Sequence, residues 1–379
     1  MVQYTYYSMD EFDDLSGDLW QLVGTNISDD RQLVPYGTTK TIVTAYGTFL
    51  TGVSCGLHVT ILVALSRLVT GGSSGLDTTL LTFFSGCQLC SVVFGVPFEI
   101  IREYFGKWYF GATLCKVWIS YSHLFVPIML WLLTALALDR IYDLRCMRVY
   151  KYTKKTCKTS FMLLGVFLLS AVGLVPLQAW MHLEPRFVLL EVCAVIVDRE
   201  YTLILAALFY FIPTCVLVGC LIVLAVQARK RIAQLGRAER QESLIALDPK
   251  TNCPVHEEKC RTSHDVDTFI ADMKNSCVCI TVTSFICVAM WAPFYVSNVW
   301  LSHGNCDNSF CLDPKLWELF QWIGYTNNLI CPCVLFIDKR LRATIRYWMR
   351  LDINHGDFVY RKNNNRARRK GSDVSTSIV

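Results

Sequence analysis

Seven long stretches of this chain are apolar and nearly free of charge, and they restrict its fold more than any other feature. Each has at least about 20 residues, the length that an α-helix needs to cross the hydrocarbon core of a bilayer. One such stretch is compatible with a buried helix of a soluble protein, but seven together indicate an all-α membrane protein, a seven-transmembrane helix bundle. The predicted spans are 41–66, 77–99, 114–140, 159–182, 201–228, 276–302 and 316–337.

The charged residues predict the orientation of the spans. Only 18% of the 379 residues are charged, whereas soluble domains average about 25%. The segment 1–40 is acidic, while Lys and Arg concentrate in the loops after the third and fifth spans and in the tail at Arg366–Lys370. The positive-inside rule therefore predicts an extracellular N-terminus and a cytosolic C-terminus. No signal peptide opens the sequence, so we expect the first span to act as the signal anchor.

This orientation gives a predicted organisation for a multi-pass protein of the plasma membrane. Residues 1–40 form an extracellular acidic tail, and residues 41–337 form the seven-span domain. Residues 338–350 form an amphipathic helix with Leu341, Ile345 and Trp348 on one face, which favours a position along the membrane surface. Residues 351–379 form a cytosolic tail.

The third span has the most distinctive pattern. Cys115 lies at its outer end, and Val117–Leu138 lacks a formal charge apart from the titratable His123. Asp139 and Arg140 follow at once. Placing ionisable side chains at a membrane boundary costs free energy, and such residues are usually functional. Asp139 and Arg140 are therefore candidate functional residues.

The order of several motifs resembles the rhodopsin-like (class A) G-protein-coupled receptors, from roughly Thr41 to Arg350. The residues that carry the resemblance are Trp108-x-Phe110-Gly111 before Cys115, Asp139-Arg140-Ile141, Pro213, Met290-Trp291-Ala292-Pro293-Phe294 and Pro332. The resemblance implies a cell-surface receptor that transduces an extracellular ligand into activation of a heterotrimeric G protein. It implies a receptor rather than an enzyme, without a cofactor.

The resemblance also implies roles for particular residues. Arg140 would be the cytosolic switch, paired with Asp139 at rest and released toward the G protein, with Asp272 as a further ionic partner. Trp291 would be the toggle beneath the ligand cavity. Pro293 and Pro332 would be hinges, because a proline inside a helix removes a hydrogen bond and bends the axis.

The expected ligand pocket is aromatic and mildly polar, a lining that suits a peptide or an apolar molecule. Ser122 stands where amine receptors of this family place an aspartate, which argues against a serotonin-like or dopamine-like ligand. The acidic tail and Glu99 favour a basic peptide, with Glu99 and Arg102 facing water or a ligand. His123 is expected to be a hydrogen-bonded structural residue rather than a pH sensor. The predicted pocket comprises Glu99, Trp118, Ser122, His123, Phe294, Tyr295, Asn298, Gln321 and Tyr325.

Several positions depart from the family pattern. Gln88 replaces the aspartate of the second span and cannot supply the carboxylate of a sodium site. Cys331-Pro332-Cys333 replaces the usual Asn-Pro pattern, and Cys287 replaces a phenylalanine. The polar network that couples ligand to switch is therefore expected to be largely absent. A constitutively active, ligand-independent receptor is the alternative within the class.

The 18 cysteines divide by depth. Most lie within the spans, where a thiol behaves as a small hydrophobe, and no spacing indicates a zinc site. Four lie on the outward, oxidising side. The expected pairs are Cys115–Cys193 and Cys306–Cys311, although a sequence does not fix the connectivity.

The terminal segments carry modification and docking signals. Asn26-Ile27-Ser28 is a glycosylation sequon in the extracellular tail. Ser372, Ser375, Thr376 and Ser377 are candidate sites for receptor kinases that recruit arrestin. Ser377-Ile378-Val379 fits a PDZ ligand, against the alternative of an unbound tail.

A multi-pass transporter is the alternative from a different class. It would show internal repeats or several intramembrane charges, and a membrane enzyme would show paired catalytic groups at depth. The sequence has none of these patterns. No nucleic-acid partner is expected.

Overall fold

The computed structural model describes residues 36–70, 76–145, 155–175, 177, 193, 199–246, 256–303 and 314–348. Within these residues the regular secondary structure is helical, in long segments joined by short turns. The helices are α3 (Tyr36–Thr70), α4 (Leu76–Cys90), α5 (Val96–Phe105), α6 (Gly111–Arg145), α7 (Lys155–Val172), α10 (Arg199–Ala206), α11 (Ile212–Ala246), α12 (His256–His303), α13 (Pro314–Leu335) and α14 (Lys339–Trp348).

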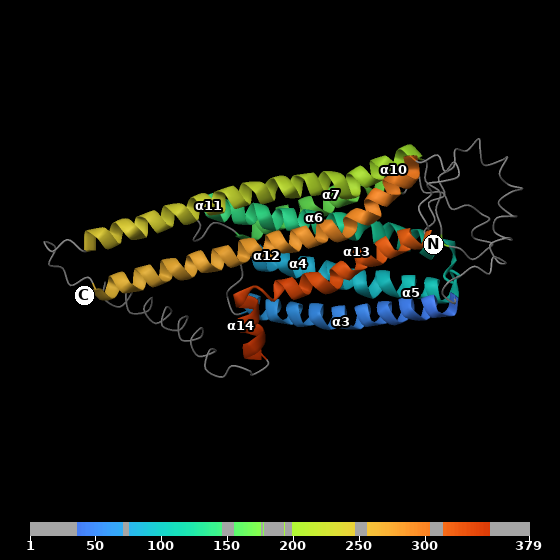
Figure 1. Ribbon diagram of the computed structural model, residues 1–379, viewed down its shortest axis with the longest axis horizontal. Helices are drawn as coiled ribbons and strands as arrows, with labels where there is room; N and C mark the ends of the chain where they lie inside the picture. Colours follow the sequence, from blue (N-terminus) through green and yellow to red (C-terminus); the bar gives the residue numbers. More distant parts are fainter. Residues whose placement is uncertain are drawn as a thin grey trace, which may run out of the picture.

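The long helices lie side by side along one axis, and α14 crosses the end of the bundle (Figure 1). Helix α6 is the central element because it packs against α4, α7, α11 and α12. Its middle turns are buried on all sides, as expected for a helix that is hydrophobic all round. Helices α11 and α12 extend past the other helices at the end where α14 lies (Figure 1).

Five of the described helices are long and apolar enough to cross a membrane. They cover Lys40–Val69, Thr78–Phe105, Gly111–Arg145, Glu200–Gln234 and Lys274–Trp300, and a shorter apolar helix covers Ser160–Val172. Helix α13 is less apolar because Gln321, Asn327 and Asn328 interrupt it, and all three side chains are buried in the bundle. Large apolar side chains such as Phe161 and Phe285 instead face outward, as lipid-facing residues do.

Two turns of π-helix adjust the bundle next to prolines. Ser91–Gly95 is a π-helical turn that joins α4 to α5 just before Pro97. Ala207–Phe211 joins α10 to α11 in the same way just before Pro213. Such bulges locally rotate the side chains that follow and are frequent at functional sites.

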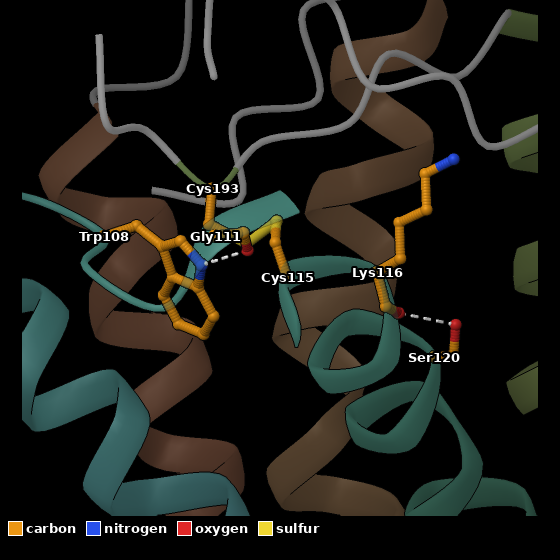
Figure 2. The surroundings of a disulfide bond; sticks show 6 residues. All are labelled: Trp108, Gly111, Cys115, Lys116, Ser120 and Cys193. Carbon is orange, nitrogen blue, oxygen red and sulfur yellow. Dashed lines mark hydrogen bonds between the residues drawn. A yellow bond between two sulfur atoms is a disulfide. The ribbon is translucent and has the colours of Figure 1, made fainter. Parts of the chain in front are cut away.

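The end of the bundle at which α6 begins, called the outer end after the predicted orientation, is tied to Cys193, which lies between α7 and α10 in the sequence. A disulfide joins Cys115 to Cys193, the first of the two expected pairs. Figure 2 shows this bond beside Trp108, whose indole Nε1 donates to the carbonyl of Gly111 at 2.9 Å. Cys306 and Cys311, the second expected pair, lie outside the described residues, as does Asn26.

Helix α14 folds back onto the inner end of α3. Leu341 and Ile345 are buried in this contact, and both belong to the face that the sequence predicts. The carboxylate of Asp338 accepts a hydrogen bond from the backbone N–H of Leu341 at 3.4 Å. An aspartate in this position caps the first turn of a helix, so Asp338 fixes where α14 begins.

Candidate functional site

A cavity of about 30 Å³ lies between α6, α12 and α13. Its walls are Trp118, Ile119, Ser122, His123, Val126, Trp291, Phe294, Tyr295, Trp317, Gln321 and Tyr325. The structure thus brings together seven of the nine predicted pocket residues. Glu99 and Asn298 do not line the cavity. The sequence reasoning missed Trp317, whose position one turn before Gln321 on α13 was an available signal.

Aromatic rings enclose most of this cavity. The ring of Trp291 lies 5.9 Å from those of both Phe294 and Tyr325, in edge-to-face geometry. Tyr295 stacks on Tyr210 of the π-helical turn at a centroid distance of 4.7 Å. Helix α13 approaches Trp291 closely at Gly324, where a Cβ would come within 2.6 Å of the indole. Trp291 therefore occupies space that only a glycine leaves open.

The polar groups around the cavity are few and only partly paired, since the Oγ of Ser122 and the Nε1 of Trp291 have no hydrogen-bond partner among the described residues. The Nδ1–H of His123 donates to the carbonyl of Ile119 at 2.8 Å, which ties the imidazole to its own helix. Asn298 accepts from the indole of Trp317 at 2.7 Å and so positions a wall residue from behind. Gln321 donates to the hydroxyl of Tyr325 at 3.4 Å. Among the described residues, the Oε1 of Gln321 has no hydrogen-bond partner.

Of the two expected surroundings of Glu99 and Arg102, water or a ligand, the structure excludes open water. Both are buried, with 0% and 4% of their surfaces exposed, and they form an ion pair with each other. Arg102 also contacts the carboxylate of Glu103 at 2.7 Å. Helix α5 is capped by Gly106, whose left-handed φ is 67° and whose backbone N–H donates to the carbonyl of Arg102.

A small set of polar groups forms hydrogen bonds in the middle of the bundle, while the expectation that the network coupling ligand to switch is largely absent stays a prediction. His58 of α3 hydrogen-bonds to Ser85 of α4 at 2.9 Å and to the backbone carbonyl of Asn328 of α13 at 3.0 Å. The thiol of Cys331 donates to Asn327 at 2.9 Å. A histidine inside an apolar span was the sequence signal that could have found this set of polar groups, because buried polar groups in membranes need partners.

At the inner end of α6, Asp139 is buried and Arg140 is partly exposed. Arg140 contacts the carboxylate of Asp143 at 3.4 Å, one turn further along the helix. This ion pair differs from the expected one with the adjacent Asp139, because residues three apart share a helix face and adjacent residues do not. Arg140 also borders a small cavity with Cys279 and Asp338. The side chain of Asp272 lies outside the described residues.

Comparison with known proteins identifies the class of protein to which this geometry belongs. The family model described as 7 transmembrane receptor (rhodopsin family) matches residues 60–335, more than half of the chain. The chain therefore belongs to the rhodopsin family of seven-transmembrane receptors. This membership confirms the predicted resemblance and a receptor rather than an enzyme, and it displaces the transporter alternative.

A solved structure supports the same fold. Squid rhodopsin matches with a TM-score of 0.67 at 13% identity, over 85% of this chain and 88% of that protein. At this identity the likeness shows the fold alone, and it confirms the seven-transmembrane helix bundle predicted from the sequence.

Two curated relatives match this chain at low identity and over part of their own length. The mouse 5-hydroxytryptamine receptor 6 is 24% identical over 269 residues, which cover 66% of this chain and 58% of that receptor. The rat 5-hydroxytryptamine receptor 5A is 25% identical over 258 residues, 63% of this chain and 68% of that receptor. The match thus spans less than two thirds of the first of these relatives.

Proposed function

We propose that this protein is a plasma-membrane receptor that binds an extracellular peptide with a basic group and activates a heterotrimeric G protein in response. The observation that supports this function best is the aromatic cavity between α6, α12 and α13, with Trp291 in its wall. Two of these helices also carry the residues at the cytosolic end, so one set of rigid elements joins the two sites.

The proposed coupling runs along α12. Trp291 precedes Pro293 by two residues, and a proline inside a helix weakens it and allows a bend. A ligand that displaces Trp291 would change this bend and move the inner part of α12. Cys277 lies 14 residues before Trp291 on α12, or about 21 Å at 1.5 Å per residue. Its thiol is close enough to Arg140 to interact with it electrostatically. The movement would release Arg140 from Asp143 toward the G protein.

Ser122 favours a peptide over a small amine as the ligand. Two relatives are named as serotonin receptors, and the amine receptors of the family place an aspartate at the position of Ser122. A hydroxyl lacks the charge that holds an ammonium group. A serotonin-like amine remains the second candidate, because the comparison supports it directly.

A ligand-independent receptor is the alternative within the same mechanism. The cavity has room for about one water molecule, whereas sites for drug-sized ligands are roughly ten times larger. Trp317, Phe294 and Tyr295 fill the space between the helices with their rings. A ligand would therefore have to displace these side chains, and a receptor whose switch is released without a ligand would need no such change.

Further expected features lie outside the described residues and remain predictions. They are the glycan at Asn26, the Cys306–Cys311 pair, the ionic role of Asp272, the kinase and arrestin sites from Ser372 to Ser377, and the PDZ ligand at Ser377-Ile378-Val379. Apart from Asp272, which would hold the switch residue Arg140, each concerns regulation or stability, so the proposed signalling does not depend on it.

Basal nucleotide exchange tests the proposed function. The full-length receptor, expressed at the cell surface, is assayed without ligand against each class of G-protein α subunit, beside Arg140→Ala. We expect exchange with at least one class, reduced to background in the variant, because the guanidinium contacts the G protein. The matched control is Lys116→Ala, which removes a cation from the opposite end of α6. Full exchange by Arg140→Ala at equal surface expression would refute the switch.

A synthetic library of basic peptides then tests the ligand. Peptides that raise exchange above the basal level support a ligand-gated receptor, and tryptamine serves as the amine comparison. An unchanged basal level across the library would favour the ligand-independent alternative.

A further inference from the structure

Four ionisable side chains gather where α5 ends and α13 begins. Glu99, Arg102 and Glu103 lie in the last two turns of α5, and Glu318 lies in the second turn of α13. Arg102 pairs with Glu99 and, at 2.7 Å, with Glu103. The carboxyl group of Glu318 lies near enough to Glu103 and Arg102 to interact electrostatically with both. One guanidinium thus pairs with two carboxyl groups and has a third nearby.

This cluster holds more negative than positive charge in a place with little water. Glu99 and Arg102 are buried, while Glu103 is partly exposed with 19% of its side chain accessible. Uncompensated charge in such a site is costly. The ammonium of Lys40 lies beside Gly106 and is a further cation at this end of the bundle, on its rim.

The nearness of Glu103 and Glu318 is unfavourable when both are ionised. Ionised carboxylates are acceptors only, so two neighbouring ones repel each other unless one carries a proton or a cation donates to both. An ammonium has three donors and a guanidinium has five, and either group fits a set of several carboxylates.

The cluster continues directly into the cavity. Tyr325 lines the cavity and interacts electrostatically with Glu99 and Arg102. Gln321 lies one turn after Glu318 on the same helix, is only 7% exposed and also lines the cavity. Its Oε1 has no hydrogen-bond partner among the described residues. A buried acceptor without a donor is unfavourable, and this one belongs to a residue that lines a space next to the cluster.

We propose that Glu103 and Glu318, with Glu99 behind them and the Oε1 of Gln321 beside them, bind the cationic group of the ligand. The group is an ammonium or guanidinium, and its site is on α5 and α13 rather than at Ser122 of α6. Tyr325, which interacts electrostatically with Glu99 and Arg102, adds aromatic surface near this site, which favours a cation further. This inference rests on the proposed function as a receptor for an extracellular ligand.

A metal ion is a poorer occupant of the cluster. The described residues contain no group of three or more His, Cys, Asp or Glu side chains arranged to hold a metal ion. A proton shared by Glu103 and Glu318 is the remaining competitor, and the experiment separates it from an organic cation.

Binding is measured on the purified full-length receptor in lipid nanodiscs, by the shift of its thermal unfolding midpoint with probe concentration. The cationic probes are tryptamine and arginine amide, and the neutral matched probe is N-acetyltryptamine. The variants are Glu318→Gln and Glu103→Gln, which keep shape and remove one charge. Glu200→Gln, on the exposed outer end of α10, is the control for losing an acidic residue.

We expect the cationic probes, but not N-acetyltryptamine, to raise the unfolding midpoint. Their apparent affinity should fall about tenfold or more in Glu318→Gln and Glu103→Gln, since each variant loses a charged hydrogen bond. Glu200→Gln should bind like the native chain. Without probe, Glu318→Gln should unfold at the same or a higher temperature, because it loses a repelling charge, whereas a purely structural Glu318 would lower it.

Three results would overturn the proposal. They are no shift with either cation, an equal shift in the native chain and Glu318→Gln, or a native midpoint that responds to pH but not to the cations, which would assign the site to a proton. The assay contains no G protein, so a failure of binding leaves the Arg140 test of coupling standing, and the reverse also holds.

Discussion

Individual residues in this receptor matter most where two helices approach each other. Gly324 of α13 admits the indole of Trp291, and Gly47 of α3 admits Ile100 and Trp322 in the same way. Gly52 and Gly56 lie on the outer face of α3, where a Cβ would meet nothing within 4 Å. Glycines of the same helix therefore differ in what they do for the fold.

Gly324→Ala should destabilise the receptor and disturb its basal signalling. The new Cβ would come within 2.6 Å of Trp291, so the indole must move, and overpacking of this kind costs about 1–3 kcal/mol. Thermal unfolding of the purified receptor, followed by tryptophan fluorescence, measures the effect.

Gly56→Ala is the control for this change. It adds the same methyl group on an open face and should be neutral or stabilising by up to about 1 kcal/mol. Equal midpoints for the two variants would show that Trp291 does not need the space at Gly324.

At the scale of elements, the helices are interrupted and tied together at particular places. The π-helical turns before Pro97 and Pro213 set how α5 and α11 continue from the preceding segments. The disulfide ties α6 to residue Cys193, 78 positions later in the chain. These devices fix the outer end of the bundle, where the cavity and the charged cluster lie.

Removing the disulfide should therefore weaken the outer end. The double variant Cys115→Ser, Cys193→Ser is expected to lose about 2–5 kcal/mol of unfolding free energy and much of its surface expression, because the loop is no longer closed. Flow cytometry of intact cells and the unfolding midpoint report the two effects.

A thiol on the lipid-facing side provides the matched comparison. Cys215 of α11 is exposed on the outside of the bundle and unpaired. Cys215→Ser should leave expression within experimental error. Similar losses in both cases would indicate that any cysteine change, rather than the bond, is responsible.

At the scale of the whole molecule, the bundle has two unlike ends. The outer end carries the disulfide, the cavity and the charged cluster. At the inner end α14 folds across α3, and α11 and α12 extend beyond the other helices (Figure 1). The distribution of basic residues predicts that the inner end is cytosolic.

Epitope tags test this orientation. A tag placed before Met1 should be accessible to antibody on intact cells, and a tag placed after Val379 should become accessible only after permeabilisation. We expect this result because basic loops are retained in the cytosol during membrane insertion. Staining of the C-terminal tag on intact cells would contradict the orientation.

The sequence by itself determined the class of this protein. The class follows from a set of local patterns: seven apolar stretches, the order of the proline and aromatic motifs, and the Asp139–Arg140 pair. Each pattern can be recognised in the sequence without knowing how the helices pack. The same holds for the apolar face of α14 and for most of the cavity wall, because the family pattern fixes which helix face each residue occupies.

Tertiary structure alone decided which polar groups meet. Glu318 and Glu103 are 215 positions apart and become neighbours only because the end of α5 lies near the beginning of α13. His58 joins three helices because they pack together, and Arg102 is buried with Glu99 as its partner. Burial and partner choice depend on the surface that another helix presents, and a one-dimensional pattern carries no record of that surface.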